Sequence, residues 1–108
     1  MTLFQLLDYL KIRPNMYLKA KSLAELEAFM GGYTIALYLN GIETKMDNLF
    51  QDFYDYIYST YEIEKFHTWY EAVNLLAKLD DSDPFDKFFE IFDQFKTSLN
   101  SKFINVEE

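Results

Sequence analysis

The longest run of helically spaced hydrophobic residues extends from Ser22 to Asn40. One stripe recurs every three or four residues, as on one face of an α-helix, and consists of Leu23, Leu26, Met30, Tyr33 and Leu37. Four more apolar residues widen it, namely Phe29, Ile35, Ala36 and Leu39. A helix that is apolar on most sides is usually buried on most sides. We therefore expect this helix to be the central element that the other helices cover.

Local signals mark both ends of this helix and its middle. Ser22 and Glu25 have the spacing of a capping box, and Asn40-Gly41 supplies a left-handed stop. Gly31-Gly32 lies at the centre, where each glycine costs about 1 kcal/mol of helix stability relative to alanine. That cost is explained if a second helix crosses closely at this point.

Four further helices are predicted, at residues 3–12, 48–61, 69–79 and 84–99. Pro14 ends the first of them, because the residue before a proline is disfavoured in helical geometry. Met16, Tyr17 and Leu18 then form an apolar patch that we expect to fold back onto the core. Asp47 is the expected N-cap of the second of these helices.

The last two helices have the clearest boundaries. Thr68 is the expected N-cap of the helix at 69–79, whose buried positions would be Trp69 or Tyr70 with Val73, Leu76 and Leu79. Asp83 as N-cap and Pro84 at the first helical position favour a helix start. This helix has an apolar stripe of Phe85, Phe88, Phe89, Phe92, Phe95 and Leu99. From Asn100 onward we expect a frayed tail.

The predicted fold class is all-α: a compact single-domain bundle of about five helices that includes residues 1–108. The chain has no cysteine, which excludes disulfides and thiolate metal sites. No apolar run approaches the roughly 18 residues that a membrane span needs, and the N-terminus lacks the pattern of a signal peptide. A cytoplasmic protein that contacts no membrane is the expectation.

The net charge of −8 is unevenly distributed. Residues 1–46 carry five basic and four acidic residues, whereas residues 47–108 carry five basic and fourteen acidic ones, a net charge of −9. Such a surface repels nucleic acid and attracts basic partners. The alternative is that acidity only keeps an aromatic-rich domain soluble.

No pattern indicates catalysis. Asp80-Asp81-Ser82-Asp83 is the best candidate for a metal site, but a proline and a phenylalanine follow it, so helix capping is the preferred interpretation. His67 is the only histidine, and we interpret it as structural or incidental. We expect no enzyme activity, no catalytic or metal-binding residues and no cofactor.

The segment from residue 47 to residue 64 is the best candidate for a partner-binding surface, because it combines three Asp, two Glu and four Tyr. Tyrosine is a preferred interface anchor, and carboxylates bind Lys and Arg through charge-assisted hydrogen bonds. The predicted partner-binding residues are Asp47, Asp52, Tyr54, Asp55, Tyr56, Tyr58, Glu62 and Glu64. Alternatively, the tyrosines only seal the edge of the core.

The chain also resembles a group of small bacterial proteins. The similarity lies in Arg13-Pro14-Asn15-Met16-Tyr17-Leu18, in the Ser22-Leu23 to Gly32-Tyr33 pattern, in Trp69, and in the Phe-rich segment from Phe88 to Phe95. Those proteins are immunity proteins of polymorphic or contact-dependent growth-inhibition toxin systems. Asn15 and Lys19 stand where glycines are usual, which affects the local turn. The resemblance implies a fold and a role, but no binding residues.

Three hypotheses follow from charge and resemblance together. The first is a cytoplasmic immunity protein whose acidic second half blocks a basic toxin domain, with a nuclease expected. The second is an acidic regulatory or structural module that self-associates through its tyrosines. The third is a DNA mimic that sequesters a DNA-binding protein. The partner in the first case is the cognate toxin domain, not nucleic acid or membrane, and the oligomeric state is left open.

Overall fold

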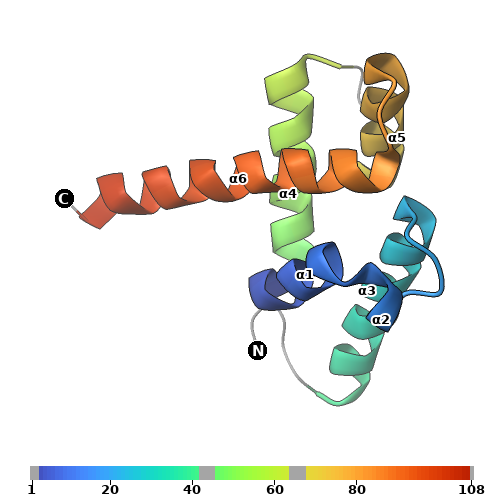
Figure 1. Ribbon diagram of the computed structural model, residues 1–108. Helices are drawn as coiled ribbons and strands as arrows, with labels where there is room; N and C mark the ends of the chain where they lie inside the picture. The colour runs from blue at the N-terminus through green and yellow to red at the C-terminus, as the bar shows by residue number, and fades with distance from the viewer. Residues whose placement is uncertain (1–2, 42–45, 64–67, 108) are drawn as a thin grey trace. The chain divides into compact units, whose positions relative to one another are not determined.

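The computed structural model describes residues 3–41, 46–63 and 68–107, and all regular structure in these ranges is helical (Figure 1). This confirms the all-α class. The helices are α1 Leu3–Ile12, α2 Pro14–Tyr17, α3 Leu23–Leu39, α4 Met46–Tyr61, α5 Trp69–Asp80 and α6 Pro84–Glu107. Five of them are the expected helices, and α2 is an addition. No described helix is long and apolar enough to cross a membrane.

The chain divides into two compact units, residues 1–50 and 51–108, and each is described by itself. The first unit contains α1, α2 and α3 and has an aliphatic core. Its buried residues are Leu6, Leu7, Leu10, Leu18, Leu23, Leu26 and Met30. The expectation that residues 1–108 form a single domain stays a prediction.

The first unit differs from expectation after α1. α1 ends before Pro14, as predicted, but Pro14 then begins the additional helix α2, because proline at the first helical position needs no N–H donor. The single turn closes through a 2.8 Å hydrogen bond from the Leu18 N–H to the Pro14 carbonyl. Met16 and Tyr17 therefore lie on the exposed side of the turn, and only Leu18 is buried.

Both ends of α3 are as predicted. The Ser22 hydroxyl accepts a 3.1 Å hydrogen bond from the Glu25 N–H, which caps the first turn. Gly41, just after the end of α3, has φ of +72°, the left-handed geometry that is typical of a helix C-terminus.

The expected burial of α3 is mostly wrong. Only Leu23, Leu26 and Met30 are buried, and α3 has a second, exposed apolar side. No atom lies within 4 Å of a Cβ added at Gly31 or Gly32, so the expected close crossing is not present in the described residues. At 1.5 Å per residue, α1 is about 15 Å long and α3 about 25 Å. With α2 only one turn long, the unit is too small to enclose α3.

The second unit contains most of α4 together with α5 and α6, and its core is aromatic. Phe53 of α4 lies at its centre, with ring centroids at 6.3 Å from Trp69, 5.6 Å from Phe88, 5.2 Å from Phe92 and 5.5 Å from Phe95. Edge-to-face and tilted pairs of this kind stabilise by more than their buried area alone. The Phe stripe predicted for the last helix is buried, apart from the half-buried Leu99.

The caps of α5 and α6 are also confirmed. The Thr68 hydroxyl accepts from the Glu71 N–H at 3.1 Å, and the Asp83 carboxylate accepts from the Asp86 N–H at 3.1 Å. On α5, however, Leu79 is exposed, and Ala72 and Ala77 are buried instead. Small alanines at these positions let α5 approach its neighbours closely.

Two helix boundaries were predicted wrongly. α4 begins at Met46, so Asp47 lies inside its first turn and is not the N-cap. α6 continues to Glu107 instead of fraying at Asn100, which agrees with the absence of glycine and proline after Pro84. His67 lies outside the described residues.

Candidate protein-binding surface

The exposed side of α4 is acidic. We call it the α4 acidic face and define it by the exposed helical residues Gln51, Asp52, Asp55, Tyr58 and Ser59, together with the exposed Glu62, which directly follows the helix with φ of 50°. Residues three, four and seven apart share one side of a helix, so the five helical residues of this face lie opposite the buried residues Phe53 and Ile57. The face presents three carboxylates and one tyrosine, and no basic side chain is among the residues that define it.

Seven of the eight predicted partner-binding residues fall into three groups in the structure. Asp52, Asp55, Tyr58 and Glu62 are exposed together on the α4 acidic face, with Tyr58 44% exposed. Tyr56 is half-buried, with its ring centroid 5.5 Å from that of Phe95. The side chain of Asp47 and the whole of Glu64 lie outside the described part of the structure.

Tyr54 is a correction. It is only 8% exposed, so its placement in the partner-binding set was wrong. Helix rotation explains the error: at 100° per residue, Tyr54 lies about 60° from the buried residue Ile57 and Tyr58 about 100° from it. A binding face built from many tyrosines is therefore reduced to Tyr58.

Hydrogen bonds within α4 order part of this face. The Gln51 amide Nε2 donates to Asp55 Oδ1 at 3.2 Å, one turn along the helix. The Ser59 hydroxyl donates to the Asp55 carbonyl at 2.9 Å. The two bonds use Oδ1 and the backbone carbonyl of Asp55, and neither uses its Oδ2.

A second acidic stripe lies on α6 and was missed from the sequence. Asp86 and Glu90 are exposed, Asp93 is half-buried, and all three lie on the side opposite the buried phenylalanines. The signal was present in the spacing of the three carboxylates at i, i+4 and i+7. This spacing is easily overlooked because the phenylalanine stripe is the more conspicuous pattern in the same segment.

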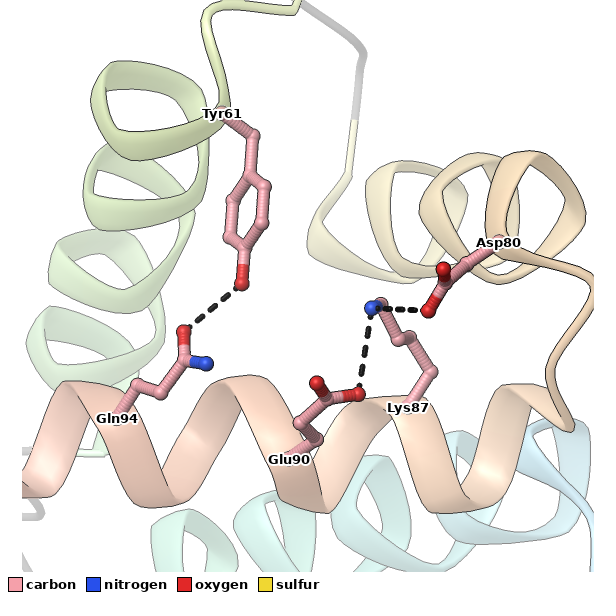
Figure 2. Close-up of polar contacts among 5 residues, drawn as sticks. All are labelled: Tyr61, Asp80, Lys87, Glu90 and Gln94. Atoms are coloured by element: carbon pink, nitrogen blue, oxygen red, sulfur yellow. Dashed lines mark hydrogen bonds and ion pairs between the residues drawn. The ribbon is translucent and has the colours of Figure 1, made fainter.

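Figure 2 shows the polar contacts that connect the helices of the second unit. The Tyr61 hydroxyl of α4 donates to Gln94 Oε1 of α6 at 2.8 Å. Lys87 Nζ of α6 lies 2.9 Å from Asp80 Oδ2 of α5 and 3.2 Å from Glu90 Oε2. These contacts fix α4 and α5 on α6 at the polar edge of the aromatic core.

Lys87 is the one charged side chain buried among the described residues, and sequence reasoning missed it. Its side chain is 8% exposed, whereas those of Asp80 and Glu90 are 58% and 53% exposed. The hydrogen bond to Asp80 raises the pKa of Lys87 above its usual value, against the opposing effect of burial. Lys87 is therefore charged at neutral pH, with its stem against the core and its ammonium group at the edge.

Alkaline pH is expected to destabilise the protein through this cluster. Burial raises the pKa of Tyr61, and the Asp80 contact raises that of Lys87. Both groups thus hold their protons more tightly when folded, so their contribution is complete below the unfolded pKa values of about 10 and 10.4 and is lost at higher pH. In urea unfolding measured from pH 8 to 11, the free energy of unfolding should stay constant up to about pH 10 and fall above it.

Lys87→Met is the control for this pH dependence. It keeps most of the packing of the stem and leaves Asp80 and Glu90 in contact with water. The variant should lose less stability than the wild type between pH 10 and 11, because only Tyr61 then titrates within the cluster. Equal slopes in the two proteins would show that Lys87 does not carry the effect.

The first unit has a different candidate region, an apolar concavity at the α1–α2 corner. It has a volume of about 340 Å³ and is lined by Tyr9, Ile12, Arg13, Met16 and Tyr17. Arg13 Nη1 lies 3.9 Å from the Met16 sulfur. Because its walls carry no carboxylate or histidine, the concavity can accept an apolar side chain but has no acid–base pair.

The acidic segment between α5 and α6 has structural roles. Asp80 pairs with Lys87, Asp83 caps α6, and Asp81 takes the left-handed geometry that ends α5, with φ of 53°. Among the described residues, no group of three or more Asp, Glu, His or Cys side chains is arranged to hold a metal ion.

No protein-family model, curated protein or solved structure matches this sequence. Of the surfaces described above, the α4 acidic face is the one on which exposed carboxylates and an exposed aromatic side chain coincide.

Proposed function

We propose that this protein is a cytoplasmic immunity protein that binds and neutralises a cognate bacterial toxin domain, a nuclease by expectation, through the α4 acidic face. The observation that carries the proposal is the joint exposure of Asp52, Asp55 and Tyr58 on one side of α4, with the exposed Glu62 directly after the helix end. The resemblance to small immunity proteins supports the assignment of the partner as a toxin.

The charge balance of the second unit supports a basic partner. Residues 51–63 and 68–99 contain ten acidic and three basic residues. Two of the three basic residues are engaged in ion pairs, Lys87 with Asp80 and Glu90, and Lys96 with Asp93 at 3.5 Å. A toxin that binds a phosphate backbone needs a basic active site, and an acidic surface steers the encounter with such a site.

The contact chemistry follows from the same residues. Carboxylates on the rim of an interface mainly increase the association rate, whereas a central aromatic side chain supplies much of the binding free energy. Asp55 lies one turn before Tyr58 on α4, and Glu62 directly follows the last residue of the helix. Both would bind Lys or Arg side chains of the toxin. Tyr58 would be the anchor between them.

The test uses the toxin domain encoded beside the gene for this protein. Changing both Asp52 and Asp55 to lysine should lower the association rate constant about 10- to 1,000-fold at low salt, with a smaller effect at high salt. Surface plasmon resonance gives the rate, and survival of toxin-expressing cells gives the biological result.

The matched control is the pair Asp8→Lys and Glu27→Lys, which makes the same change in net charge at exposed residues of the first unit. This control should bind almost as the wild type does. If the two double variants behave alike, the location of the α4 acidic face is irrelevant. If the wild type does not bind the neighbouring toxin, the immunity role itself is wrong.

A further inference from the structure

The exposed side of α3 is apolar along its whole length. We call it the α3 outer face and define it by Ala24, Ala28, Gly31, Gly32, Ile35, Tyr38 and Leu39, all exposed. At 100° per residue it lies opposite the buried residues Leu26 and Met30. α3 is thus apolar on both sides. One side is buried in the core of the first unit, and the other is exposed.

Side-chain size changes along the α3 outer face in a definite order. The N-terminal half consists of alanines and glycines, and the C-terminal half of large side chains. Ile35, Tyr38 and Leu39 are 60%, 79% and 76% exposed, which places them among the most exposed large hydrophobic residues described. No charged residue belongs to this face, although Glu25 and Glu27 lie at its two edges.

We propose that two copies of this chain pair through the α3 outer face, with their α3 helices antiparallel about a two-fold axis at Gly31-Gly32. A two-fold interface brings the same patch of both copies together. With Gly31 opposite Gly32 of the second copy, Leu39 lies opposite Ala24 and Ile35 opposite Ala28. In this register Ile35 and Leu39 thus each meet a small side chain, and Tyr38 lies opposite Glu25.

The face itself argues for a second copy over an unrelated helix. The side chains of this face are small in its N-terminal half and large in its C-terminal half. In an antiparallel pair of copies, the small half of each helix therefore lies against the large half of the other. Two adjacent glycines weaken a helix, and within the chain nothing lies within 4 Å of either Cβ position. A crossing at this point uses the space that the two missing side chains leave, because small residues let helix backbones approach closely.

The expected dimer is weak. α3 is about 25 Å long, and a helix pair of this length buries less than the roughly 800 Å² per partner of a standard interface. We therefore expect exchange between monomer and dimer in the micromolar concentration range. Sedimentation equilibrium over a wide range of protein concentrations measures the dissociation constant.

Gly32→Leu tests the crossing point with two opposite readouts. Overpacking a close helix contact should raise the dimer dissociation constant at least about fivefold. The same change should raise the thermal midpoint of the dilute monomer, because leucine is a better helix former and no atom lies within 4 Å of that Cβ. Ser59→Leu adds equal bulk at an exposed position of α4 and should leave the dissociation constant unchanged.

Disulfide trapping tests the register, since the chain has no cysteine. Ala28→Cys with Ile35→Cys should give a covalent dimer on oxidation, because each cysteine faces the other kind in the second copy. Within one helix these positions are too far apart to bridge. Ala24→Cys with Ile35→Cys does not fit the register and should stay monomeric. A wild-type monomer at every concentration, or a dimer that Gly32→Leu leaves unchanged, would overturn the proposal.

Discussion

Replacing Phe53 with alanine is expected to lower the free energy of unfolding by about 3–5 kcal/mol. Phe53 is fully buried, and its ring contacts four others from α5 and α6. Alanine would leave a cavity where the three helices of the second unit meet. Since small domains are stable by only about 5–15 kcal/mol, this single change should bring the protein close to unfolding at 37 °C.

Urea unfolding followed by far-UV circular dichroism measures this loss without relying on the ring environment of Trp69. Tyr58→Ala is the matched control, because it removes an aromatic ring from the exposed side of the same helix. Surface changes of this kind usually stay within about 0.5 kcal/mol. Similar losses in both variants would contradict the central position of Phe53 in the core.

Helix existence and helix caps were predictable because they depend on neighbouring residues. Ser22, Thr68 and Asp83 each accept a hydrogen bond from an N–H three residues later, and that geometry is encoded locally. The phenylalanine spacing of α6 likewise fixes one buried side whatever the partner helix is. These features required no knowledge of how the helices pack.

Burial was less predictable because it depends on residues distant in the sequence. The two sides of α3 are both apolar, so the pattern could not decide which one the first unit covers. Leu79 is exposed although its spacing matched the buried residues of α5. Lys87 can be buried because its ammonium group forms an ion pair with Asp80, which lies on another helix. A hydrophobic pattern cannot predict such a pair, since lysine reads as an exposed residue.

The candidate site was predicted in part for the same reason. Asp52 and Asp55 follow the polar side of a helix, and their exposure could be predicted from helical period alone. Tyr54 and Tyr58 are chemically identical, and only the rotation of α4 against its neighbours separates the buried ring from the exposed one. The acidic stripe of α6 needed attention to carboxylate spacing on the side opposite the phenylalanines.

Leu26→Ala is expected to lower the free energy of unfolding by about 2–5 kcal/mol, because Leu26 is fully buried in the aliphatic core of the first unit. It also tests the prediction that residues 1–108 form a single domain. Trp69, the only tryptophan, lies in the second unit and reports on that unit. In a single cooperative domain, a cavity in the first unit must shift the Trp69 fluorescence transition as far as the circular dichroism transition.

Leu39→Ala is the matched control in dilute protein, since Leu39 belongs to the same helix and is 76% exposed. It should move neither transition by more than about 0.5 kcal/mol. The decisive comparison is between the two probes in Leu26→Ala. If the Trp69 transition stays at its wild-type midpoint while the dichroism becomes biphasic, the two units unfold independently and the single-domain prediction is wrong. If both transitions move together, the aliphatic and aromatic cores belong to one cooperative domain.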